Sequence, residues 1–160
     1  MITDPLSFRY HTPYQAKRKS SHYYCAAMLR YTHDRTTEEF VNVGVLVVGS
    51  DNAFVGLQVD VSVPRLWAVW GPTEVPDKRV EALKIELTIL RELVATRLSP
   101  IPDDLSEVLK TVIAMTATKT LSWSLMFGGF TSNLLLAMDG LFRRRIERYN
   151  KPHHIVNKHT

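Results

Sequence analysis

Hydrophobic and polar residues alternate along three stretches in the first half of the chain, which is the pattern of strands that bury one face. The stretches are His22–Tyr31, Glu38–Val48 and Ala53–Asp60, and they are rich in β-branched and aromatic residues. A polar loop over 32–37 and the turn residues 49–52 separate them. Because such short connections join antiparallel neighbours, the pattern predicts a three-stranded meander.

The middle strand of this meander carries the most informative residues. Strict alternation would place its valines at 41, 43, 45 and 47 on one face, which we expect to be core. The other face would hold Phe40, Asn42, Gly44, Leu46 and Val48. A glycine inside a strand marks a bulge, a bend or a close approach to the backbone. Either Gly44 makes room for another part of the fold, or the face of Asn42 and Gly44 binds a partner.

The rest of the chain combines helical periodicity with one more strand. Apolar residues recur every three or four positions over Pro76–Leu98, and a second such run follows Asp103. Strict alternation over Leu121–Phe127 predicts a fourth strand, and the Gly128-Gly129 turn leads to a final helix that begins at Ser132. The elements predict an α+β domain, in which an antiparallel sheet of about four strands is packed by two or three helices on one face.

Positive charge gathers at the two ends, whereas the middle of the chain is mildly acidic. We expect a basic N-terminal arm over 1–20, a single domain over 21–150 and a basic, histidine-containing tail over 151–160. The basic residues singled out are Lys17, Arg18, Lys19, Arg143, Arg144, Arg145 and Arg148. Such ends suit nucleic acid or an acidic protein surface, and they are also common as simple solvated termini.

Cysteine usage and hydropathy indicate the compartment. Cys25 is the single cysteine, so no internal disulfide can form and a reducing setting is expected. No apolar run approaches the roughly 18 residues that span a bilayer, and no secretory signal is visible. These features predict a soluble, cytoplasmic protein that does not contact a membrane.

Polar residues beside the middle strand are the candidates for chemistry. Arg30 and Glu39 flank one hairpin, so they could form an ion pair across adjacent strands. Glu38 and Glu39 are strand neighbours that would point to opposite faces, which argues against a carboxylate pair for acid–base catalysis. The candidate binding residues are Arg30, Glu39, Asn42, Gly44 and Arg65.

No pattern in the sequence points to a metal or a cofactor. His153, His154 and His159 are close in sequence, but a metal site needs converging ligands held by surrounding residues. Gly128-Gly129 before a helix is similar to an anion-binding loop, yet it lacks the lysine and the spacing of a phosphate-binding loop. We therefore expect no catalytic residue, no metal and no cofactor.

Segments of the first two strands resemble a bacterial family without assigned activity, catalogued as domain of unknown function three-zero-three-seven. The resemblance lies in Tyr23-Tyr24, Leu29-Arg30-Tyr31 and Glu39-Phe40-Val41-Asn42-Val43-Gly44-Val45, with weaker similarity at Gly129-Phe130-Thr131 and Leu141-Phe142. It spans about 22–148. Glu38 departs from the pattern, because members often carry glycine or a basic residue there, and the basic arm and tail lie outside it.

The resemblance implies a small accessory protein that accompanies a HipA-like kinase or a toxin. The departures are compatible with a phage- or element-encoded protein that captures a host defence complex.

Three functions are therefore weighed. The first is a non-enzymatic binding protein that docks a protein partner through the face of Asn42 and Gly44 or through an exposed strand edge. The second is a nucleic-acid or nucleoprotein binder that uses the basic ends. The third is a small hydrolase or nuclease centred on Glu39, Asn42 and Arg30.

Overall fold

The computed structural model describes residues 7–12, 21–34, 39–49, 54–61, 77–97, 110, 114, 120–124 and 127–147. Their strands are β1 (Ser7–His11), β2 (His22–Asp34), β3 (Glu39–Gly49), β4 (Val55–Asp60), β5 (Leu121–Trp123) and β6 (Phe127–Thr131). The helices are α2 (Asp77–Arg97) and α4 (Leu134–Phe142), and α4 continues into the π-helical turn η2 (Arg143–Glu147).

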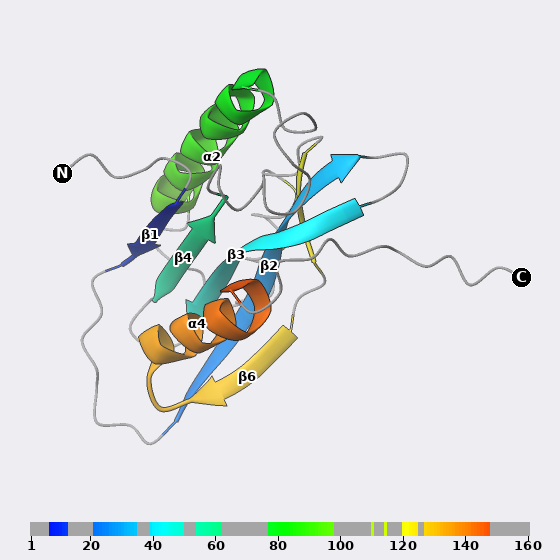
Figure 1. Cartoon of the computed structure of the whole chain (residues 1–160). Helices are drawn as coiled ribbons and strands as arrows, with labels where there is room; N and C mark the ends of the chain where they lie inside the picture. Colours follow the sequence, from blue (N-terminus) through cyan, green and yellow to red (C-terminus); the bar gives the residue numbers. More distant parts are fainter. Residues whose placement is uncertain are drawn as a thin grey trace, which may run out of the picture.

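The strands form one antiparallel sheet in the order β1-β4-β3-β2-β5, and β6 pairs with β2 as well (Figure 1). The predicted meander is confirmed, because β2 pairs with β3 and β3 pairs with β4. With its helices the sheet makes the α+β fold that the sequence predicted.

Two parts of the sheet differ from the prediction. Ser7–His11, which we expected within a basic arm, form the edge strand β1 and pair with β4. Phe8 of this strand is only 6% exposed. Apolar and polar residues alternate here over a short stretch among prolines and charged residues, and this alternation is enough for the strand to pair. The single strand predicted over 121–127 is two strands, β5 and β6, which pair with different parts of β2.

Gly128 and Gly129 lie inside β6 and do not form the predicted turn. A Cβ added to Gly128 would lie 2.9 Å from Oη of Tyr23, and one added to Gly129 would lie 2.7 Å from Oη of Tyr24. The two glycines therefore leave room for tyrosine rings that reach across from β2 on opposite faces of the sheet.

The N-cap of the final helix lies one residue later than predicted. Asn133, not Ser132, is its N-cap, and the Asn133 side chain accepts a hydrogen bond from the backbone N–H of Leu136.

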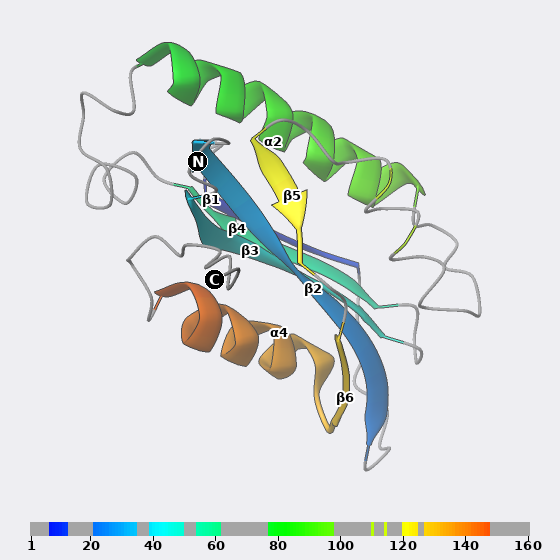
Figure 2. The same cartoon turned by 90° about the vertical axis from the view of Figure 1, so that its right-hand side faces the viewer.

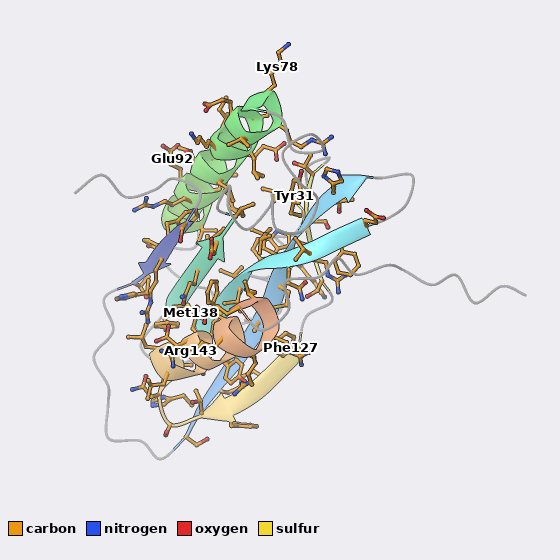
Figure 3. All side chains as sticks on the ribbon, viewed as in Figure 1. Tyr31, Lys78, Glu92, Phe127, Met138 and Arg143 are labelled. Atoms are coloured by element: carbon orange, nitrogen blue, oxygen red, sulfur yellow. The ribbon has the colours of Figure 1, made fainter. Side chains whose placement is uncertain are left out.

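Helices cover both faces of the sheet, and the prediction that they lie on one face was wrong (Figure 2). α2 packs on one face through the predicted stripe of Val80, Leu83, Leu87, Leu90 and Val94. α4 and η2 cover the opposite face with Leu134, Met138, Leu141 and Ile146. Figure 3 shows Lys78 and Glu92 of α2 pointing away from the sheet. Strands with apolar residues on both faces need cover on both faces, which explains the three-layer arrangement.

A bulge at Val43 divides the valines of β3 between the two faces. Leu29 pairs with Gly44 and Arg30 pairs with Asn42, so that Val43 is the extra residue on β3. Val41 and Val43 belong to the core under α2, whereas Val45 and Val47 belong to the core under α4. The prediction from strict alternation that all four valines share one face is therefore wrong.

Apart from residues 110 and 114, the helix predicted after Asp103 lies outside the described residues. In the part of the chain that is described, no helix is long and apolar enough to cross a membrane.

Candidate functional site

A row of polar side chains crosses three strands on the α4 side of the sheet. Arg30 of β2 lies opposite Asn42 of β3 and also opposite Ser122 of β5. Residues paired in this way point to the same face, and the sequence neighbours of all three face α2. All three are partly exposed, and Figure 1 shows this end of β2 and β3 extending beyond α4. We call these residues the Arg30 row.

The guanidinium of Arg30 is held over an aromatic ring and has no carboxylate partner among the described residues. Its Cζ lies 4.4 Å from the centroid of the Phe40 ring. Its Nε is buried and forms no hydrogen bond, and the side chain makes no ion pair with any described residue. Burial lowers the pKa of Arg30, because the charged form loses hydration. No described residue therefore compensates this partly buried positive charge.

The remaining predicted site residues do not join this row. Glu39 lies opposite Asp34 in the register, so the ion pair with Arg30 that the hairpin suggested is not formed. A Cβ added to Gly44 would meet Leu29 and Val59, which places Gly44 on the α2 face, away from Asn42. The prediction that Asn42 and Gly44 share a face is therefore wrong, because the bulge interrupts the alternation. Arg65 lies outside the described residues.

The strand β6 forms an exposed edge of the sheet. Within the described residues it pairs only with β2. Phe130 is 74% exposed and packs against Tyr23 of β2, with ring centroids 5.3 Å apart, and Tyr23 is itself 42% exposed. Leu136, in the first turn of α4, is 66% exposed. Apolar side chains thus remain in solvent around an open strand edge.

A buried polar cluster, which the sequence did not reveal, lies where the end of β2 meets α2. Nη1 of Arg79 donates to the carbonyl of His33 at 2.8 Å and to its Nδ1 at 3.0 Å, and lies 3.5 Å from Oη of Tyr31. In the same region, Thr120 donates to Glu86. Arg79 and His33 are 46 residues apart, so no local motif signals this cluster.

We expect Tyr31→Phe to reduce the loss of stability at alkaline pH. Burial raises the pKa of Tyr31 above 10.0, and Glu86 raises it further, whereas Arg79 acts in the opposite direction. The unfolded chain therefore releases this proton first, and stability falls as the pH rises from about 10 through the folded-state pKa. Urea unfolding at about pH 8 and about pH 11 measures the effect. An equal loss of unfolding free energy in both proteins would contradict the prediction.

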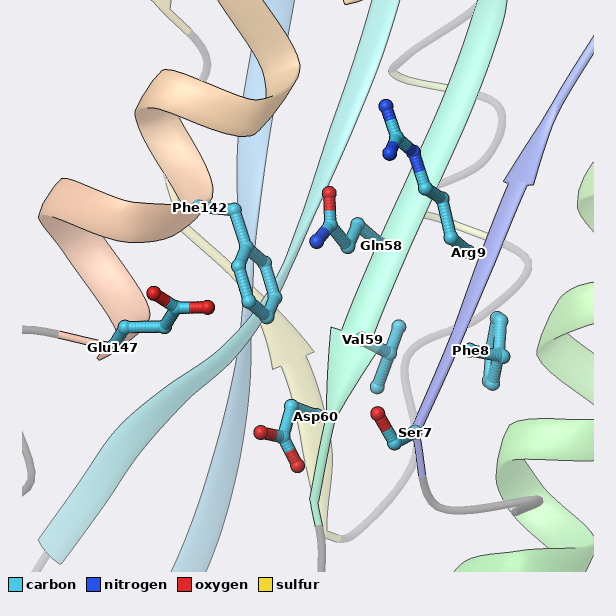
Figure 4. Close-up of a pocket in the computed structure, with 8 residues that line it drawn as sticks. All are labelled: Ser7, Phe8, Arg9, Gln58, Val59, Asp60, Phe142 and Glu147. Carbon is cyan, nitrogen blue, oxygen red and sulfur yellow. The ribbon is translucent and has the colours of Figure 1, made fainter. Parts of the chain in front are cut away.

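A cavity of about 340 Å³ opens between β1, β4 and the end of η2 (Figure 4). The side chains that Figure 4 shows around it include Arg9, Gln58, Asp60, Phe142 and Glu147. Arg9 forms an ion pair with Asp139 at 3.1 Å, so its charge is already offset. Two carboxylates then dominate the lining, which disfavours anions there. The sequence offered no signal for this cavity, because β1 was not expected.

The predicted basic groups are described only in part. Arg143, Arg144 and Arg145 are exposed on η2 and make no ion pair with a described residue. Lys17, Arg18, Lys19 and Arg148 lie outside the described residues. Among the described side chains, no group of three or more His, Cys, Asp or Glu could hold a metal ion.

Most of the sheet and both helices fall within a span that matches a known family. The family model described as "Protein of unknown function (DUF3037)" matches residues 26–146. The chain belongs to the DUF3037 family. No curated protein and no solved structure matches the chain. In this DUF3037 protein the matched span contains the Arg30 row and β6, but it leaves out β1 and the first residues of β2.

Proposed function

We propose that this DUF3037 protein is a non-enzymatic binding protein that docks an extended segment of a protein partner on the open edge of β6. The observation that carries the proposal is the exposed Phe130 on a strand that pairs only with β2 among the described residues. A peptide that adds to such an edge gains main-chain hydrogen bonds, and pockets for alternate side chains supply specificity. Phe130 and Tyr23 would supply the aromatic contact.

The composition around β6 supports strand addition. Natural proteins protect edge strands with charges, prolines or bulges, because an open edge pairs readily with other chains. The sequence from Thr120 to Met138 contains no charged residue and no proline, so β6 has neither protection. An uncharged, exposed edge of this kind fits an apolar or uncharged partner segment better than an acidic or basic one.

The partner belongs to the proposal as well. The family resemblance suggests a HipA-like kinase or toxin, or a host defence complex. The β6 edge would bind any of these partners without catalysing a reaction.

Phe130→Lys is expected to abolish partner binding while leaving the fold intact, because Phe130 is mostly exposed. The full chain is used to capture a stoichiometric partner from its native host with nuclease present, and the purified partner is then titrated with each variant. Ile85→Lys is the matched control, since Ile85 is 62% exposed on α2, far from β6 in the fold. Equal partner affinity of Phe130→Lys and the wild type would refute docking at β6.

A second candidate, nucleic-acid binding, is favoured by one observation, the three consecutive exposed arginines of η2. If these arginines neutralise phosphates, the affinity for nucleic acid should fall steeply as the salt concentration rises. Fluorescence anisotropy with labelled DNA and RNA at several salt concentrations tests this candidate, with the triple substitution of Arg143, Arg144 and Arg145 by glutamine as the control. No binding at low salt would rule it out.

A further inference from the structure

We propose that the Arg30 row binds an oxyanion, the carboxylate or phosphate group of a ligand. The site lies on different residues from the β6 edge, so it stands or falls independently of partner docking. Neither the family match nor its description assigns a ligand to these residues.

Arg30 lacks a counter-charge among the described residues. A partly buried arginine in a folded protein normally has a carboxylate or several carbonyls around it, because an uncompensated charge is costly to bury. Arg30 has neither an ion pair nor a side-chain hydrogen bond within the described structure, and its Nε is fully buried. Perturbed charged groups of this kind gather at functional sites. An anionic ligand would supply the absent partner.

The guanidinium of Arg30 lies over the ring of Phe40. The Phe40 ring under the guanidinium restrains its plane, so the fork of N–H groups is held in position before a ligand arrives. The Arg30 side chain is only partly buried, and of its guanidinium nitrogens only Nε is a buried atom without a hydrogen-bond partner. A planar fork matches the two oxygens of a carboxylate or of a phosphate.

The neighbours of Arg30 in the row carry polar groups. Ser122 carries a hydroxyl and Asn42 carries an amide, and each lies opposite Arg30 in the register. Both groups can donate hydrogen bonds to an oxyanion that is bound by Arg30. Glu39 does not compete for Arg30, because the alternation along β3 places it with Val41 on the α2 side.

The other polar sites of the molecule are less suited to an anion. Arg79 already donates to His33, and Arg9 already pairs with Asp139. Arg91 also lies over a ring, with Cζ 5.4 Å from the centroid of Phe8, but it is exposed on α2. Among the arginines that the structure describes, burial, orientation and the lack of a carboxylate therefore coincide at Arg30, and Arg91 provides a matched control.

The test is an NMR titration of the full-length protein that follows the Arg30 Nε–H signal and the Asn42 side-chain amide. The probes are sodium acetate, inorganic phosphate and N-acetylglutamate N-methylamide, each compared with sodium chloride at equal ionic strength. We expect saturable shifts with at least one oxyanion and none with chloride. Stronger binding of phosphate would indicate a phosphate-bearing ligand, and stronger binding of the glutamate compound an acidic side chain of a protein.

Variants separate a binding role from a purely structural one. Arg30→Gln should remove the saturable shift of the Asn42 amide, and Arg91→Gln should retain it. Arg30→Lys should weaken binding about tenfold, because a lysine is a point charge that cannot bind two oxygens side by side. The wild-type titration decides the question even if Arg30→Gln does not fold. Absence of saturation in the wild type, or unchanged saturation in Arg30→Gln or Arg30→Lys, would overturn the proposal.

Discussion

Leu87→Ala is expected to lower the free energy of unfolding by about 2–5 kcal/mol, the usual cost of a cavity in a packed core. Leu87 is completely buried and belongs to the core between α2 and the sheet. α2 is held on the sheet by one apolar stripe. Loss of the Leu87 side chain from the middle of this stripe therefore weakens the contact of the whole helix with the sheet. Urea unfolding followed by circular dichroism measures the change.

Ile85→Ala is the control for this experiment. It lies on the same helix, but its side chain is 62% exposed. Surface substitutions of this kind usually change stability by no more than about 0.5 kcal/mol. Similar losses for Leu87→Ala and Ile85→Ala would mean that α2 does not pack on the sheet through the stripe described above.

Gly44→Ala is expected to lower the free energy of unfolding by about 1–3 kcal/mol, because the added methyl group has no space. Its Cβ would lie 3.0 Å from the backbone oxygen of Gln58, 3.0 Å from Cγ2 of Val59 and 3.3 Å from Cβ of Leu29. Two of these atoms are fixed by strand pairing on either side of Gly44. The neighbours therefore cannot move aside without distorting the centre of the sheet.

Gly140→Ala is the matched control, since the same change is made in α4. There the nearest atom to the new Cβ is Nη1 of Arg144 at 3.4 Å, on a flexible and exposed side chain. Alanine in place of a helical glycine typically stabilises by about 0.4–1 kcal/mol. Thermal unfolding of the two variants should therefore show opposite shifts in Tm, and a gain in Tm for Gly44→Ala would contradict the crowding inferred around Gly44.

Local periodicity predicted much of the fold, because the strands of the meander and the stripe of α2 carry their signals within a few residues. β1 was missed because Phe8 and Tyr10 alternate over only five residues and pair with β4 far along the chain. Gly128 and Gly129 suggested a turn, but their role is to accommodate rings from β2 about 100 residues earlier in the sequence. Such distant packing leaves no trace in a short window of sequence.

The candidate site was predicted to a similar extent. The sequence brought Arg30 and Asn42 into one candidate set, and the register places them side by side. It joined Gly44 and Glu39 to them wrongly, because strict alternation could not anticipate the bulge at Val43. The contribution of Ser122 depends on β5, and the Arg79 and His33 contact depends on how α2 docks, so neither follows from residue spacing.

The bulge at Val43 also has a consequence for how chains of this family can vary in length. Removing one residue from a regular strand turns every following side chain to the other face, which a sheet covered on both sides cannot accept. Val43 is the extra residue of the β2–β3 ladder, and both it and Gly44 face α2. A relative that lacks this one residue would keep Asn42 beside Arg30 and Leu46 in the core. Within β3, this position can absorb a one-residue deletion without exchanging the two faces of the sheet.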